Sequence, residues 1–351
     1  MINTREYSYG VGVPLEDAEN ARLRLIRSNQ LSKTMKPIRK TNYVIFPILD
    51  PNIIPDLLKG INFVIEKYSF DENRKYKDIE EILSLEFPNV DFNEITFKYD
   101  QMGEIGVLKL DPDSTTFAFR RRAGELVMSQ SPKIKVVVNK IHNVEGVERI
   151  YPIEYLAGEK ITQSWHLEYG VFINFDIKTT YFNPRLAEEH NRVAMLGSPR
   201  EKILDLFCGV GPFALHCAKR FSCRIIALDI NTYAIYALKR SIIRNKLNGR
   251  IFPIIGEFPY IFQTKKYFDR IIMNLPQKSV DFLPYAIKLI KKEGIITLYQ
   301  FIPKSERPEK DICRLIAKKM GKVNSYKVLF NKVGREVSPS KVQMNVDLQI
   351  V

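Results

Sequence analysis

Between residues 203 and 302 the chain alternates short apolar runs with longer amphipathic stretches. The runs are typical of buried strands, and the stretches between them have helical periodicity. Apolar strands that alternate with helices form parallel sheets covered by helices on both faces. We therefore expect an α/β fold, in the order strand "ILDLF", helix "PFALHCAKRF", strand "RIIALDI", helix "TYAIYALKRSIIRNKL", strands "RIFPIIG" and "DRIIMNLP", helix "VDFLPYAIKLIKK" and strand "GIITLYQFI".

The turn after the first of these strands, "DLFCGVGP", predicts a ligand site. Gly209 and Gly211 lack side chains, so the backbone can approach a ligand closely and adopt a positive φ. Pro212 suits the first turn of the helix that follows. Ligands of such sheets bind beyond the carboxyl ends of the strands, and we expect this turn to face one.

Two acidic residues near the turn favour S-adenosylmethionine over a dinucleotide. The dinucleotide pattern G-x-G-x-x-G would end at residue 214, where the chain has alanine, a substitution that is sometimes accepted. Asp205 ends the first strand, where its carboxylate would repel a diphosphate and attract the amino group of S-adenosylmethionine. Asp229 ends the second strand, where an acid can bind the ribose hydroxyls of either cofactor.

The end of the fourth strand, "NLP" at residues 274–276, indicates a contact to a planar base. Asn274 can hydrogen-bond a ring nitrogen, and Pro276 offers a rigid edge for stacking. Asparagine and proline also simply end strands, so the pattern is weak alone. Beside the glycine turn it favours a methyl acceptor with a planar ring.

Length and composition point to a cytoplasmic protein of two or three domains, because 351 residues exceed the usual size of one domain. No apolar stretch approaches the roughly 18 residues of a membrane span, and the first residues lack the layout of a signal peptide. The cysteines at 208, 217, 223 and 313 form no CxxC pair. Cys208 and Cys217 with His216 do not complete a metal site, so we predict buried free thiols and no metal.

A net charge of +14 and an isoelectric point near 9.4 make a polyanionic partner plausible. The positive charge is dispersed, with one cluster at residues 120–122 that includes Arg120 and Arg121. Nucleic acid is the usual polyanion for such a protein. On charge alone, a lysine-rich composition that only improves solubility is an equal alternative.

Shifts in pattern divide the chain into four segments. Residues 1–70 read as a small α/β domain, and the charged start of residues 71–92 indicates a linker that ends in a helix, "IEEILSLEF". Residues 93–182 have a mixed α+β pattern, with alternating strands such as "IKVVVNKI" and "VFINFDIKTTYF". Residues 183–351 form the α/β domain.

At these motifs the chain resembles the archaeal and eukaryotic class I tRNA (guanine-N1)-methyltransferases that act on tRNA position 37. The resemblance rests on "ERIYPIEYLAGE", "YFNPRLAEEHNRV", "DLFCGVGPFA" and "NLPQKS", and covers most of the chain. It implies a Rossmann-like methyltransferase domain with a mostly parallel seven-stranded sheet, preceded by an α+β RNA-binding domain. The first segment resembles the compact N-terminal domain of the archaeal enzymes, which in that family recognises the tRNA elbow.

The resemblance also implies roles for single residues. Glu189 matches the general base, with Glu188 as the neighbouring alternative, and Arg149 matches the arginine that stabilises charge on the guanine. Asn274 and Pro276 match residues that hold the target base. The implied cofactor pocket comprises Asp205, Phe207, Gly209, Gly211, Asp229, Ile230, Glu257, Asn274 and Pro276. The implied tRNA contacts are Arg185, His190 and Tyr151, and the basic cluster at residues 120–122 adds Arg120 and Arg121 as expected tRNA contacts.

Guanine chemistry requires residues of these types. N1 of guanine carries a proton at neutral pH, so a carboxylate must remove it while a cation stabilises negative charge on O6. The target base must also leave its stack to reach the methyl donor. Without the resemblance, solvated acids in "LAEEHNR" and a salt-bridged Arg149 would be the more ordinary interpretations.

Two positions depart from the family pattern. Tyr151 and His190 stand where the family often has arginine; a tyrosine there can stack on a base and a histidine can contact phosphate. Some archaeal relatives methylate carbon 7 of a tricyclic wyosine precursor at the same position, and this is the alternative activity. A tRNA-binding scaffold without activity is the non-enzyme alternative. We expect a monomer, because no protein partner is implied.

Overall fold

The computed structural model describes residues 5–32, 34–71, 79–92, 95, 97–141, 152–262, 265–320 and 325–351. The chain divides into two compact units. The first comprises residues 1–95 and 129–131, and the second comprises residues 96–128 and 132–351. None of the helices in the described part of the chain has the length and apolar character needed to cross a membrane.

The first unit is built on a four-stranded antiparallel sheet. Its strand order is β2 (Ile38–Arg39), β3 (Tyr43–Pro47), β1 (Arg5–Pro14) and β4 (Val64–Asp71). The helices α1 (Ala18–Arg27) and α2 (Ile54–Leu57) bury Leu25 and Ile54 with Val11 and Val13 of β1. The helix expected in "IEEILSLEF" is present as α3 (Ile79–Glu86).

The second unit contains a seven-stranded sheet, and this confirms the predicted α/β class. The order is β13 (Arg250–Ile255), β12 (Arg224–Asp229), β11 (Lys202–Leu206), β14 (Phe268–Met273), β15 (Ile290–Pro303), β17 (Lys341–Ile350) and β16 (Tyr326–Ser338). The first five strands are parallel, and β17 and β16 are antiparallel to their neighbours. The sheet is therefore mostly parallel, as expected.

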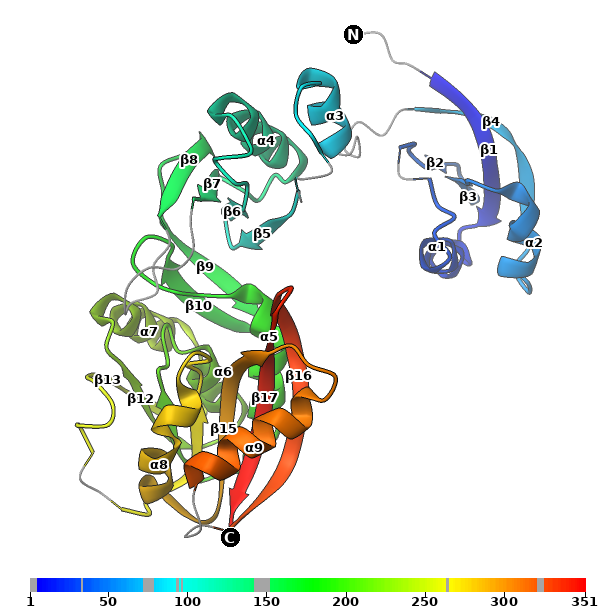
Figure 1. The fold of residues 1–351 in the computed structure, drawn as a ribbon. Helices are drawn as coiled ribbons and strands as arrows, with labels where there is room; N and C mark the ends of the chain where they lie inside the picture. Colours follow the sequence, from blue (N-terminus) through cyan, green and yellow to red (C-terminus); the bar gives the residue numbers. More distant parts are fainter. Residues whose placement is uncertain are drawn as a thin grey trace. The chain divides into compact units, whose positions relative to one another are not determined.

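Helices cover both faces of this sheet (Figure 1). Side chains of α5 (Ala187–Met195), α6 (Pro212–Arg220) and α7 (Thr232–Arg244) join one apolar core. Those of α8 (Ser279–Leu289) and α9 (Pro308–Met320) join the core on the other face. Burial on both faces explains why the central strands read as continuous apolar runs rather than as alternating ones.

The same unit contains a second sheet of four strands, in the order β5 (Tyr99–Met102), β6 (Ile105–Leu108), β7 (Val136–Lys140) and β8 (Ile153–Gly158). Helix α4 (Phe117–Gln130) connects β6 to β7. A hairpin of β9 (Gln163–Glu168) and β10 (Val171–Asp176) follows. Val136 and Val138 belong to the same core as Phe175 and Phe213, so one apolar core crosses the boundary expected near residue 182.

Hydrogen bonds also connect the hairpin to α7, one of the helices that cover the large sheet. The backbone N–H of Asn174 in β10 donates to Ser241 Oγ of α7 at 2.8 Å. Asn245, which follows α7, accepts from the N–H of Phe172 at 2.9 Å and donates to its carbonyl at 2.7 Å. These bonds fix β9 and β10 beside the α/β layers.

Candidate functional site

The glycine turn between β11 and α6 has the conformation that its sequence indicates. Gly209 and Gly211 have φ of +55° and +75°, in the left-handed region that favours glycine. A Cβ on Gly211 would lie 2.5 Å from Cδ1 of Leu238, whereas one on Gly209 would meet only the carbonyl oxygen of Tyr181, at 3.6 Å. Pro212 is the first residue of α6, as expected.

A cavity of about 300 Å³ lies at the carboxyl ends of the parallel strands, against this turn. The segments that follow β11, β12, β13 and β14 all contribute to it, together with the chain around η3 (Pro184–Leu186) before α5. Of the residues assigned to the cofactor or to the target base, Phe207, Gly209, Asp229, Ile230, Glu257 and Asn274 line this cavity.

Asp229 is held in place by backbone donors at the end of β12. Its Oδ2 accepts from the N–H of Gly209 at 2.6 Å, and its Oδ1 accepts from the N–H of Asn231 at 2.8 Å. The carboxylate thus links the glycine turn to the second strand and lies in the wall of the cavity.

Asp205 does not line the cavity and is fully buried beneath the turn. Its Oδ2 accepts from the N–H of Ala214 in the first turn of α6, at 3.2 Å. Burial raises the pKa of Asp205 to about 8, against the bond from Ala214, and the charge of Asp229 adds to the rise. Its other oxygen, Oδ1, is buried without a hydrogen-bond partner among the described residues, and the contact with a cofactor amine stays a prediction. Gly211 and Pro276 also lie outside the lining.

Glu189 lies in the first turn of α5, where three donor bonds hold its carboxylate. Arg192 donates to both oxygens at 2.8 Å, and the hydroxyl of Tyr299 on β15 donates to Oε1 at 2.8 Å. Arg192 also donates to Asp347 of β17 at 2.8 Å. The side chain of Glu189 is only 13% exposed, whereas Glu188 is exposed on the same helix.

The residues proposed to contact tRNA have different environments. Arg120 is buried and forms a bidentate ion pair with Glu154, with N–O distances of 2.7 and 3.0 Å, so it does not present a cation to RNA. His190 is also buried, and its Nδ1 donates to Glu168 at 2.9 Å, which corrects the expected phosphate contact. Arg121 and Arg185 are exposed. Arg149 and Tyr151 lie outside the described residues.

A wider groove of about 1220 Å³ adjoins the cavity, because Tyr181, Phe182 and Asn183 line both. Arg185 borders the groove and donates to Asp100 at 2.7 Å. Its other basic side chains are Lys109, Lys140, Arg335 and Lys341. Burial, together with the charge of Lys109, lowers the pKa of Lys140 to about 8. The groove is also lined by the acidic side chains of Asp100, Asp111 and Glu336, so its basic side chains outnumber its acidic ones by five to three.

Three residues around Glu189 were not foreseen: Arg192, Tyr299 and Asp347. The spacing of Glu189 and Arg192, three residues apart on a predicted helix, was a usable signal because such pairs lie side by side. Tyr299 and Asp347 come from strands more than 100 residues away along the chain, and no local pattern connects them to α5.

Comparison with known protein families agrees with this architecture. Residues 10–53 match the tRNA methyltransferase 5 N-terminal domain, residues 79–162 the TYW2 N-terminal domain, and residues 164–329 the TRM5/TYW2 methyltransferase domain. The last match begins in β9, so it includes the hairpin that packs on α7.

Relatives of known structure cover nearly the whole chain. The tRNA (guanine(37)-N(1))-methyltransferase Trm5b of Pyrococcus abyssi is 31% identical over 97% of this chain and 98% of its own length. Its crystal structure superposes with a TM-score of 0.71, covering 98% of this chain and 99% of that one at 29% identity.

Two further structures contain ligands. A complex of aTrm5 with tRNALeu has a TM-score of 0.69 at 28% identity, and Methanocaldococcus jannaschii Trm5 with adenosine has 0.65 at 28%. Each covers 97% of this chain and 99% of the other. The chain therefore belongs to the tRNA (guanine(37)-N(1))-methyltransferase family.

Proposed function

We propose that this protein transfers a methyl group from S-adenosylmethionine to N1 of the guanosine at tRNA position 37. The observation that carries the proposal is the cavity at the glycine turn, which is lined by Asp229 and Asn274 and opens beside the groove of basic side chains. The relatives support it, because Trm5b of Pyrococcus abyssi is named for this reaction and a Trm5 protein has been solved with tRNA.

The cavity fits the cofactor in size and chemistry. Its volume of about 300 Å³ lies at the lower end of the range of small-molecule sites. Phe207, Ile230 and Phe258 offer apolar walls for an adenine ring, and Asp229 is placed to accept bonds from ribose hydroxyls. Glu257 lies at the rim after β13. When bound there, S-adenosylmethionine supplies an electrophilic methyl group on a sulfonium.

Glu189 is our proposed general base. Its Oε1 accepts two bonds and its Oε2 accepts one, so Oε2 retains a lone pair for the N1 proton of guanine. Glu189 would take the N1 proton as N1 accepts the methyl group that bound S-adenosylmethionine would supply. Negative charge that reaches O6 requires a cation, and Arg149 is our proposal for it. Asn274 and Pro276 are proposed to hold the base.

The proposed tRNA contacts come from the groove, from α4 and from the first unit. Arg185 and the lysines of the groove provide positive charge beside the cavity, and Arg121 adds an exposed cation on α4. The proposed role of the first unit is to recognise the tRNA elbow, supported by its match to the tRNA methyltransferase 5 N-terminal domain. Tyr151 remains a predicted stacking contact.

Methylation of carbon 7 of a tricyclic wyosine precursor is the second candidate. It is favoured by the match of residues 79–162 to the TYW2 N-terminal domain. Both activities would place the same tRNA nucleotide beside the same methyl donor, so they differ in the base accepted.

The test is to incubate the full chain with labelled S-adenosylmethionine and each of three RNAs, then digest and identify the product nucleoside. The RNAs are an unmodified tRNA transcript with guanosine 37, the same transcript with adenosine 37, and tRNA that carries the tricyclic precursor. We expect N1-methylguanosine from the first and no product from the second. Transfer only to the third RNA would replace the proposal with the second candidate, and no transfer to any RNA would favour a scaffold.

A further inference from the structure

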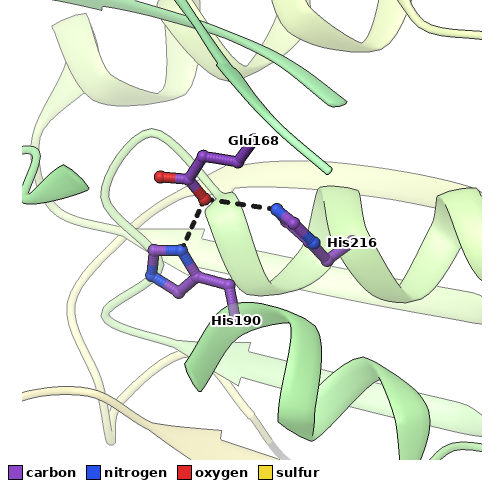
Figure 2. A group of neighbouring side chains, drawn as sticks. All are labelled: Glu168, His190 and His216. Carbon is purple, nitrogen blue, oxygen red and sulfur yellow. Dashed lines mark hydrogen bonds and ion pairs between the residues drawn. The ribbon is translucent and has the colours of Figure 1, made fainter. Parts of the chain in front are cut away.

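Three buried side chains from three elements meet in the second unit (Figure 2). Glu168 ends β9, His190 lies on α5 and His216 lies on α6. Their side chains are at most 2% exposed. Glu168 Oε2 lies 2.9 Å from His190 Nδ1 and 3.2 Å from His216 Nε2, and these atoms all lie within 4.8 Å of one another.

The hydrogen bonds drawn in Figure 2 use only one oxygen of the buried carboxylate, Glu168 Oε2. Burial of a net charge is costly unless a counterion is present. The other oxygen, Glu168 Oε1, is buried with no hydrogen-bond partner in the part of the chain that the structure describes.

A third histidine lies near the carboxylate without bonding to it. His166 Nδ1 accepts from the N–H of Gly103 at 3.3 Å. Its Nε2 lies 3.8 Å from Glu168 Oε1, which is beyond hydrogen-bond distance.

The ligand types and spacings suit a transition-metal ion. Bonds of about 2.0–2.1 Å in tetrahedral geometry place neighbouring ligand atoms about 3.3 Å apart. The two separations from Oε2, 2.9 and 3.2 Å, are close to that value. Each imidazole would bind the ion through the nitrogen that faces Oε2 and carry its proton on the other nitrogen. Two histidines and a carboxylate form a recurrent ligand set for Zn²⁺.

We propose that Glu168, His190 and His216 bind one divalent transition-metal ion. The ligand set of two histidines and one carboxylate favours Zn²⁺. The ion would neutralise the buried carboxylate and clamp β9, α5 and α6 together. His190 also lines the cofactor cavity, which provides the route of entry. The site would be structural, since it positions the helix that carries Glu189 and does not touch a reacting atom.

The experiment uses the full chain after dialysis against a chelator, titrated with Co²⁺ as a spectroscopic probe and then with Zn²⁺. The variants Glu168→Gln and His216→Asn each remove one ligand. Glu159→Gln makes the same chemical change at an exposed position of the second unit and is the matched control. Metal content, the visible spectrum of bound Co²⁺ and the Tm with and without Zn²⁺ are recorded.

We expect the wild-type chain and Glu159→Gln to bind a single Co²⁺ with the visible bands of a low-coordinate site. Zn²⁺ should displace that signal and raise the Tm. Both ligand variants should lose the signal and the Tm response. Absence of Co²⁺ uptake and of any Tm response to Zn²⁺ in the wild-type chain would overturn the proposal whether or not the variants fold. Equal uptake by Glu168→Gln and Glu159→Gln would overturn it as well.

Discussion

Glu188 and Glu189 are adjacent on α5 but have different surroundings, and this makes them a matched pair. Glu189→Gln removes the proposed base while it keeps the shape of the side chain, so we expect kcat to fall by about 10²–10⁴-fold. Cofactor affinity should stay unchanged, because Glu189 does not line the cofactor cavity. Glu188→Gln should transfer at close to the wild-type rate. Single-turnover transfer and equilibrium cofactor binding measure both effects, and a larger loss in Glu188→Gln would reassign the base.

The buried carboxyl group of Asp205 should make stability depend on pH. Its pKa is about 8 in the folded chain, against about 3.9 for an unperturbed aspartate. Between these values the folded state binds the extra proton, so stability is fully present below about pH 4 and falls as pH rises to about 8. The slope for one group approaches about 1.4 kcal/mol per pH unit.

Asp205→Asn mimics the protonated form and cannot ionise, so the difference between wild type and variant isolates this group. We expect the free energy of unfolding of wild type to fall relative to Asp205→Asn as pH rises from 4 to 8. Urea unfolding at several pH values, without cofactor, provides the comparison. Parallel pH profiles for the two proteins would mean that Asp205 is ionised in the folded chain.

At the scale of the elements, the two glycines between β11 and α6 differ in one respect. Both have a positive φ, but only Gly211 also lies against the side chain of Leu238. An L-residue in the left-handed conformation costs roughly 1–2 kcal/mol, and both Gly209→Ala and Gly211→Ala should lose about that much stability. Gly211→Ala also brings its Cβ to 2.5 Å from Leu238. We expect it to be the less stable variant, by thermal unfolding.

Gly209 lines the cavity and has open space around it, so Gly209→Ala should lower cofactor affinity more than its effect on stability explains. Calorimetric titration with S-adenosylmethionine measures this. Equal affinities for Gly209→Ala and Gly211→Ala would contradict the placement of Gly209 at the ligand surface.

The elements predicted from sequence were those with a strong local pattern. The apolar runs of the parallel strands and the glycine turn were sufficient for the α/β layers. Some boundaries were wrong. The strand expected over residues 171–182 ends at Asp176. Ile290, Lys291 and Lys292 read as the last turn of a helix, where lysines are common. They begin β15 instead, and Lys291 pairs with Asp269 of β14 at 2.6 Å. A contact with a neighbouring strand decided that boundary, and it has no local signature.

The side chains around the site were also predictable only where a local pattern or the sheet topology placed them. Asp229 and Asn274 follow strands, so their place at one edge of the sheet follows from topology. Asp205 also belongs to a strand end, but its orientation toward Ala214 depends on the packing of α6. The group formed by Glu168, His190 and His216 joins three elements, and no local pattern connects them; the sequence analysis considered only Cys208 and Cys217 beside His216 and predicted no metal.

For the whole molecule, the net charge of +14 can be interpreted once the basic side chains are located in the structure. Lys341 is exposed beside the groove, where β17 begins next to the end of β15. Lys292 is exposed at the other end of the sheet, where the parallel strands begin. The two lysines carry the same charge at different distances from the proposed tRNA path, so they make a matched pair.

If the groove holds the tRNA backbone, log Kd for tRNA should rise linearly with log salt concentration. Each lost phosphate contact lowers that slope by roughly 0.7–0.9. We expect Lys341→Gln to show this decrease and Lys292→Gln to keep the wild-type slope, although both variants lose one positive charge. Binding of labelled tRNA across a salt series decides between them. Equal slopes for the two variants would mean that the protein attracts tRNA through its net charge and that the groove is not the path of the backbone.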